Sequence, residues 1–247
     1  MKEIRAIVLL LCGLGWASAS LAAGSIYQIG MIKSLSAGVF EGTTTYAQLA
    51  KLGDFAVGTF NDLNGEMGAN DGKFYRFQSD KEPYGKLIPV ASTDISPFAQ
   101  VVYFKPTKKM LISNIENFKN LNAAIEKQLP NKNIPYAIRI KGKFENAKLR
   151  SLSKQKAPYP KLSVAAKSAA YYSMDKAEGT LVGYWFPALL NNLGPEKSHF
   201  HLISQKANMG GHLLDVKVKD AVVEIQPIHD VKILLPNNKV FARTTIK

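Results

Sequence analysis

Hydrophobic and polar residues alternate with a period of two over many short segments of this 247-residue chain, which is the pattern of half-buried β-strands. Residues 55–63 place Phe55, Val57 and Thr59 on one face, and Asn64 and Gly65 then supply the two-residue turn that a type I′ hairpin prefers. The pattern predicts a protein built mainly of sheets. Further strands are expected at 73–78, 100–104, 136–140, 144–149, 180–186, 198–204, 212–218 and 221–225.

Helical periodicity is confined to a few segments. Apolar residues recur on one helical face from 115 to 129, where Ser113 to Glu116 fits a capping box and Pro130 ends the helix. Shorter helices are expected at 45–52 and 161–169. The prolines and lysines of 154–160 mark the best boundary between two domains. We therefore expect a two-domain chain of the α/β (α+β) class, divided into residues 24–157 and 158–247.

The first 23 residues are expected to be a secretory signal peptide rather than part of the fold. A basic start with Lys2 and Arg5 precedes an apolar run at 7–16 and a cleavage site at 20–22. The run is too short to span a bilayer, although Cys12 inside it leaves lipoprotein attachment open. The pattern predicts a soluble periplasmic or secreted protein with no membrane contact after cleavage.

Composition changes this picture in two respects. Cys12 is the single cysteine, so the mature chain has neither disulfides nor thiolate ligands. The formal net charge of +13 becomes +12 without residues 1–23, which carry +1, and such a charge would suit a small anionic substrate. The lysines are spread through loops such as 105–109 and 154–161, which argues against a nucleic-acid partner and favours a solvated surface.

Candidate chemistry lies between residues 198 and 218, which are expected to form a β-hairpin. Alternation puts His199 and His201 on one face, and arms that pair symmetrically about Lys206 and Ala207 would set His201 opposite His212. Three imidazole donors without a fourth protein ligand are typical of a catalytic zinc ion, which keeps a position open for water or substrate. The alternative is a set of ordinary half-buried strand histidines. The remaining histidine, His229, is expected either at the surface or in contact with the ligand residues without binding the metal itself.

The hairpin is one of four separated motifs. They are Gly-Thr-Phe-Asn-Asp-Leu-Asn-Gly-Glu at 58–66, Tyr-Ala-Ile-Arg at 136–139, Glu-Gly-Thr-Leu-Val-Gly at 178–183, and His-Phe-His followed by Gly-Gly-His-Leu-Leu-Asp within 199–215. In this order they resemble the alpha-acetolactate decarboxylase family, over about residues 26–236. The resemblance implies an N-terminal mixed β-sheet with helices and a C-terminal antiparallel, barrel-like sheet that carries the metal site. It also implies a homodimeric carboxy-lyase that converts 2-acetolactate to acetoin and carbon dioxide.

The resemblance further implies a role for particular residues. Loss of carbon dioxide from 2-acetolactate leaves its electrons on the neighbouring carbonyl, so the catalyst must stabilise an enediolate, which zinc can do as a Lewis acid. An arginine is suited to bind the carboxylate before it departs, and a glutamate is suited to the proton transfer that completes the formation of acetoin. The implied residues are His199, His201 and His212 for zinc, Glu66 and Arg150 for catalysis, and Thr59 and Arg150 for substrate binding.

Three features of the sequence allow an alternative interpretation or depart from the family pattern. Arg139 competes with Arg150 for the carboxylate, because it lies on an expected strand whose other face is apolar. The local pattern around Glu66 favours a surface acid near a hairpin tip. The family also places a second active-site glutamate near its C-terminus, whereas residues 235–247 contain no acid.

Other classes of protein share part of this pattern. Carbonic-anhydrase-like lyases also use His-x-His with a third histidine, but theirs comes from a more distant strand. A cupin would need a carboxylate ligand soon after His-x-His, where this chain has Ser204, Gln205 and Lys206. A third possibility is an exported metal-binding protein without catalysis.

Overall fold

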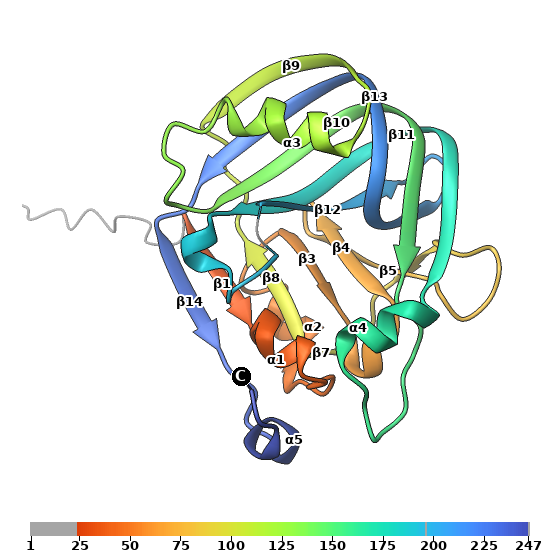
Figure 1. Cartoon of the computed structure of the whole chain (residues 1–247), viewed down its shortest axis with the longest axis vertical. Helices are drawn as coiled ribbons and strands as arrows, with labels where there is room; N and C mark the ends of the chain where they lie inside the picture. Colours follow the sequence, from red (N-terminus) through yellow and green to blue (C-terminus); the bar gives the residue numbers. More distant parts are fainter. Residues whose placement is uncertain (1–23, 196, 247) are drawn as a thin grey trace, which may run out of the picture.

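The computed structural model describes residues 24–195 and 197–246. The predicted signal peptide lies outside the described residues. Two β-sheets form most of the molecule and the helices are few and short, which confirms the predicted α+β class. Figure 1 shows the barrel-like sheet with α3 at the top and the flatter sheet of β1, β3, β4, β5 and β8 beneath it.

The flatter sheet has seven strands in the order β14-β1-β8-β3-β4-β5-β6. The sheet is mixed. Strand β1 pairs in parallel with β14, whereas the pairs β1–β8, β3–β8 and β3–β4 are antiparallel. Its strands are β1 (Ser25–Ile29), β3 (Phe55–Thr59), β4 (Glu66–Asn70), β5 (Lys73–Phe77), β6 (Leu87–Pro89), β8 (Phe98–Val102) and β14 (Asp230–Leu234).

The second sheet is antiparallel and runs in the order β10-β11-β12-β13-β9, and β10 also pairs with β13. This extra pairing closes four strands on themselves, which gives the predicted barrel-like form. A large apolar cluster that includes Ile138, Leu181, Phe200 and Val223 fills it. Its strands are β9 (Lys108–Ile115), β10 (Tyr136–Ser151), β11 (Ala170–Phe186), β12 (Lys197–Ser204) and β13 (Met209–Pro227).

The longest helix, α3 (Phe118–Glu126), begins later than the sequence predicts. Residues 108–115 instead pair with β13, and the Asn117 side chain caps the helix by accepting a hydrogen bond from the amide of Asn120 at 2.9 Å. Leu121 and Ile125 still pack against the barrel, as the helical face predicts. The remaining elements are β2 (Thr44–Thr45), β7 (Ile95–Ser96), α1 (Ile32–Ser36), α2 (Tyr46–Leu49), α4 (Leu162–Ala165), α5 (Lys239–Arg243), η1 (Asn61–Leu63), η2 (Ala166–Ser168) and η3 (Ala188–Leu190).

Strand pairing crosses the boundary predicted after residue 157. Strands β9 and β10 precede it but belong to the barrel, whereas β14 follows it and joins the flatter sheet beside β1. Figure 1 shows β14 running down from the level of the barrel along the edge of the lower sheet. Sheets form between strands that meet in space, so a loop rich in proline and lysine does not by itself separate them.

The two sheets pack face to face through a second apolar cluster. Phe55 and Val57 of β3 meet Val182, Tyr184 and Phe186 of β11, and the Tyr184 hydroxyl donates a hydrogen bond to the carbonyl of Phe55 at 3.0 Å. This packing fixes how the lower sheet faces the barrel. Over the described residues, no helix is both long enough and apolar enough to cross a bilayer.

Candidate metal centre and active site

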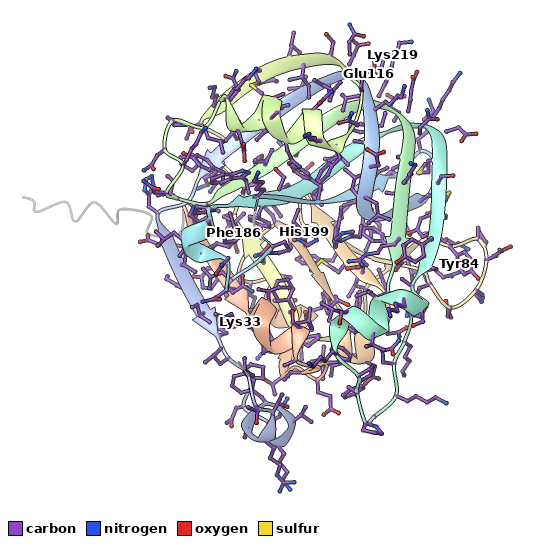
Figure 2. The ribbon with its side chains drawn as sticks, in the orientation of Figure 1. Lys33, Tyr84, Glu116, Phe186, His199 and Lys219 are labelled. Carbon is purple, nitrogen blue, oxygen red and sulfur yellow. The ribbon has the colours of Figure 1, made fainter. Side chains whose placement is uncertain are left out.

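Three strands of the barrel set a row of functional side chains on one face. His201 of β12 lies directly opposite His212 of β13, as the symmetric hairpin predicts. His212 in turn lies opposite Arg150 of β10, and opposed residues share a face. His199 precedes His201 by two residues and joins them. Figure 2 shows His199 at the centre of the molecule, between the barrel and the lower sheet.

The three histidines have the geometry and charge state of a metal-ligand set. Their candidate ligand atoms all lie within 4.8 Å of one another, and Nε2 of His199 is 3.1 Å from Nδ1 of His212. Two ligands of a tetrahedral zinc ion lie roughly 3.3 Å apart when each Zn–N bond is about 2.0–2.1 Å. Burial lowers the pKa of His199 to about 4, with a smaller contribution from Arg150. Burial also holds the pKa values of His201 and His212 well below the ordinary value, so all three are neutral donors at pH 7.

His201 is oriented from behind by the lower sheet. Its Nδ1 lies 2.7 Å from the carbonyl oxygen of Met67, and because a carbonyl only accepts, Nδ1 carries the proton. Nε2 therefore presents a lone pair to the site. Among the described residues neither this Nε2 nor the buried Oε1 of Glu66 has a hydrogen-bond partner. Oε1 of Glu66 faces Nε of Arg150, whereas the unpartnered lone pair of His201 lies close to the nitrogens of two further imidazoles. A buried lone pair in such a group suits a cation, and the three histidines fit a metal ion.

The turn that carries Glu66 differs from the predicted one. Strand β3 ends at Thr59 rather than at residue 63, and residues 60–65, with the 3₁₀ turn η1, replace the two-residue turn. Gly65 has φ +95°, a conformation that favours glycine, and its amide donates to the carbonyl of Leu152 at 3.0 Å. Glu66 then stands opposite Thr59 on the face turned to the barrel. Its side chain is 6% exposed, so the local prediction of a surface acid is wrong.

Glu66 lies between the arginine and the histidines. Its Oε1 is 3.7 Å from Nε of Arg150 and 3.9 Å from Nδ1 of His212, and its Oε2 is 3.7 Å from Nε2 of His201. Burial raises the pKa of Glu66 to about 7, because burial penalises the carboxylate more than the nearby Arg150 favours it. A carboxyl group with this pKa can both take up and release a proton at neutral pH.

Two hydroxyl groups hold the main chain at Glu66. Thr59 donates its hydroxyl proton to the carbonyl of Gly65 at 2.7 Å, which leaves oxygen lone pairs free to accept. Ser151 accepts a hydrogen bond from the amide of Glu66 at 3.1 Å and donates one to the carbonyl of Phe77 at 2.6 Å. The sequence did not point to Ser151. Its place beside Arg150 on a long strand was the only available signal.

The two arginines that the sequence left as alternatives lie in different environments. Arg139 forms a 2.7 Å ion pair with Glu224 and a 2.8 Å ion pair with Asp71, and its guanidinium stacks over the ring of Phe104. Arg150 is the arginine next to Glu66 and the histidines, and its Nε has no hydrogen-bond partner among the described residues. His229 is exposed in the connection between β13 and β14.

One small cavity unites these groups. Its volume is about 140 Å³, and its polar lining residues are Thr59, Glu66, Arg150, His199 and His212. The other lining side chains are apolar and come from segments that no motif marks. These apolar residues are Ile32, Leu35, Phe98, Leu152, Leu162 and Pro195.

The fold and the site together define an α+β protein with a three-histidine centre, one ring buried and two half-buried, that is able to hold a metal ion. A family model described as alpha-acetolactate decarboxylase matches residues 26–247. The chain therefore belongs to the alpha-acetolactate decarboxylase family, which confirms the resemblance drawn from the motifs. It is accordingly a decarboxylase, within the class of carboxy-lyases.

Individual relatives agree with the family model. An alpha-acetolactate decarboxylase of Methylococcus capsulatus is 37% identical over 211 residues, which are 85% of this chain and 80% of that protein. One from Bacillus subtilis is 35% identical over 216 residues, 87% of this chain and 83% of that protein. The crystal structure of alpha-acetolactate decarboxylase from Bacillus subtilis strain 168 superposes with a TM-score of 0.86 at 34% identity, covering 90% of this chain and 94% of that one.

Proposed function

We propose that this protein decarboxylates 2-acetolactate to acetoin and carbon dioxide, with zinc as its cofactor. The observation that carries the proposal is the single cavity of about 140 Å³ onto which two of the histidines, Glu66 and Arg150 all open. Sites for larger ligands commonly measure roughly 300–1,000 Å³, so this cavity suits a substrate of few atoms. The substrate in the names of the relatives supports the same choice.

The metal would be held by His199, His201 and His212 through ring nitrogens that burial keeps neutral. When bound, zinc supplies Lewis-acid stabilisation of the negative charge that the enediolate places on the substrate's oxygen atoms. The hydrogen bond from His201 to Met67 fixes the tautomer and the ring orientation of that ligand.

Arg150 would bind the substrate carboxylate before it leaves. Its side chain is 21% exposed, and its nearest acid is Glu66 at 3.7 Å, which is longer than a hydrogen bond. The planar guanidinium therefore keeps donors for a carboxylate, whose two oxygens match its fork. Arg139 lacks this freedom because Glu224 and Asp71 already engage it.

Glu66 would deliver the proton to the carbon atom that loses the carboxylate. Burial raises the pKa of Glu66 to about 7 in the metal-free site, and this desolvation favours the protonated form that a proton donor needs. Thr59, whose hydroxyl proton is committed to Gly65, would accept a hydrogen bond from the substrate's hydroxyl group. Both residues project from neighbouring strands of the lower sheet, which face the histidines across the cavity.

The direct test is acetoin formation by the purified, zinc-loaded protein supplied with 2-acetolactate. We expect acetoin with zinc, none after treatment with a chelator, and recovery when zinc is returned. A parallel assay of carbon dioxide hydration should show no activity. A protein that binds one zinc per chain but forms no acetoin would instead be a metal-binding protein without this catalysis.

We also propose that the protein is exported and that residues 1–23 are removed on export, on the basis of their signal-peptide pattern. Intact mass of the exported protein tests this. A mature species that retains Cys12 with attached lipid would contradict it and would make the protein membrane-anchored.

We further propose that the protein forms a homodimer, on the basis of the resemblance to the family. Light scattering coupled to size-exclusion chromatography measures the mass of the particle in solution. A mass equal to one chain over the working concentration range would overturn the proposal.

A further inference from the structure

One segment that lines the cavity carries only positive charge. Residues 152–169, called the basic segment below, lead from the end of β10 through α4 to β11 and contribute Leu152 and Leu162 to the cavity. The basic segment contains four lysines and no aspartate or glutamate. All four lysines are exposed to solvent. They are Lys154, Lys156, Lys161 and Lys167.

Hydrogen bonds hold the basic segment against the turn between β3 and β4. The Leu152 carbonyl accepts the amide of Gly65 at 3.0 Å, and the amide of Gln155 donates to the carbonyl of Asp62 at 2.6 Å. The hydroxyl of Tyr159 donates to the side chain of Asp62. Because these bonds fix the main chain of the segment, its charges lie at a defined place beside the cavity.

Helix α1 adds a fifth lysine to this region. Helices α1 and α4 contact each other toward the lower end of the molecule (Figure 1). Ile32 of α1 and Leu162 of α4 line the cavity and are half-buried, so the cavity approaches solvent beside them. Each is next to an exposed lysine, Lys33 or Lys161. Figure 2 shows Lys33 on α1, below His199.

The charge balance around the two helices is positive. Two acids contact the basic segment: Asp62 pairs with Lys154 at 3.4 Å, and Glu41 accepts a hydrogen bond from Tyr159 at 3.2 Å. In the part of the chain that the structure describes, no ion pair joins Lys33 or Lys161 to an acid. Lysines therefore outnumber acids by five to two across α1, the basic segment and the acids bonded to it.

A positive field at the cavity acts differently on the substrate and on the products of the proposed reaction. Uptake of one proton and loss of carbon dioxide convert the 2-acetolactate monoanion into acetoin, and neither product carries a charge. The field thus attracts the substrate without retaining the products. Clefts lined by charge of one sign raise the local concentration and the on-rate of an oppositely charged ligand by about 10–1,000-fold, and salt screens this effect.

We propose that Lys33 and Lys161 form, with the other lysines of the basic segment, a cationic rim that draws the anionic substrate toward Arg150 and lets the uncharged products leave. The inference rests on the proposed function for the charges of substrate and products. Lys33 and Lys161 are the residues to test, because each adjoins a lining residue and neither pairs with an acid. They do not themselves line the cavity, so they act on KM rather than on kcat.

The experiment compares KM for 2-acetolactate in the native protein and in the double variant Lys33→Glu/Lys161→Glu. We expect the double variant to raise KM by about three- to tenfold at about 10 mM ionic strength and to leave kcat close to native. The difference should largely vanish near 1 M salt, because the Debye length falls from about 30 Å to about 3 Å. The competitive inhibition constant of acetoin, which is uncharged, should be the same in both proteins.

A second double variant controls for net charge alone. Lys119→Glu/Lys132→Glu changes the net charge by the same amount at two exposed lysines, one on α3 and one in the connection after it. Neither lysine lines the cavity, and Figure 1 shows α3 at the top of the barrel. This variant should keep KM within about twofold of native. An equal rise of KM in both double variants would overturn the cationic rim.

A binding measurement keeps the inference separate from the proposed reaction. Calorimetry on the metal-loaded protein gives the affinities of the anion 2-hydroxy-2-methylpropanoate and of the uncharged ketone 3-hydroxy-3-methylbutan-2-one. Lys33→Glu/Lys161→Glu should weaken binding of the anion by about three- to tenfold and leave binding of the ketone unchanged, even if no acetoin is formed. Native affinity for the anion in this variant, at the native melting temperature, would overturn the rim.

A milder change keeps the test valid if charge reversal destabilises the protein. Lys33→Gln/Lys161→Gln removes the two charges without reversing them, and it should show a smaller loss of anion affinity in the same direction. Native anion affinity in this variant at low ionic strength would also contradict the rim. Absence of turnover alone would overturn only the proposed function.

Discussion

Nδ1 of His201 lies 2.7 Å from the carbonyl oxygen of Met67, the residue that follows Glu66 on β4. This contact joins the barrel strand that carries two histidines to the lower strand that carries the acid. The peptide carbonyl thus fixes a metal-ligand tautomer and sets the distance between ligand and carboxylate. The metal centre and the proton-transfer group are therefore one unit built across two sheets.

The ligand set predicts how metal content responds to substitution. His212→Ala removes one of three donors, so the purified protein should lose most of its zinc at limiting metal concentration. His229→Ala is the control, because that histidine is exposed and lies outside the cluster. Metal analysis after desalting measures both. One zinc per chain with native affinity in His212→Ala would show that the ligand assignment is wrong.

Metal retention should extend to unusually low pH. Protons compete with zinc for the histidine nitrogens, and burial lowers the pKa of His199 to about 4 from its ordinary 6.5. A lowered pKa means that the neutral, metal-binding form persists as pH falls, so proton competition should begin well below pH 6.5. Zinc content measured after equilibration between pH 7 and pH 4 tests this. Half-release near pH 6.5 would contradict it.

Glu66→Gln should separate catalysis from metal binding. The amide keeps the shape of the side chain but cannot deliver a proton, so kcat should fall by about a hundredfold or more while zinc is retained. Glu224→Gln serves as control, because it alters an acid that pairs with Arg139 instead. Steady-state acetoin formation measures both variants. Near-native turnover by Glu66→Gln would assign the proton to another group.

Arg150→Ala should act mainly on substrate binding. Loss of hydrogen bonds between a guanidinium and a carboxylate should raise KM for 2-acetolactate by roughly tenfold to a hundredfold. Arg139→Ala should leave KM close to native, since Arg139 is engaged by Glu224 and Asp71. If the effects were reversed, the carboxylate would bind at Arg139.

Ser151→Ala should cost stability at the junction of the sheets. The serine hydroxyl accepts the amide of Glu66, and its removal leaves that buried donor without a partner. The free energy of unfolding should fall by about 1–3 kcal/mol. Ser163→Ala, at an exposed position of α4, should change it by less than about 0.5 kcal/mol. Urea denaturation of both variants provides the comparison, and equal stabilities would exclude this role for Ser151.

The sequence alone determined what depends on local register. Strict alternation put His199 and His201 on one face, and a symmetric hairpin set His201 against His212, because both relations involve neighbouring residues of one chain segment. The helical face of Leu121 and Ile125 followed from periodicity in the same way.

The tertiary structure decided the relations between distant segments. Alternation tells which face a side chain takes but not which strand lies beside it, so the pairing of β10 with β13 that brings Arg150 to His212 was not readable from the pattern. For the same reason the pairing of β14 with β1 could not be predicted from the sequence. Glu66 is buried because the barrel covers its strand, although its neighbours in sequence are turn residues. The apolar lining residues from α1 and α4 likewise come together only when separate segments pack around one cavity.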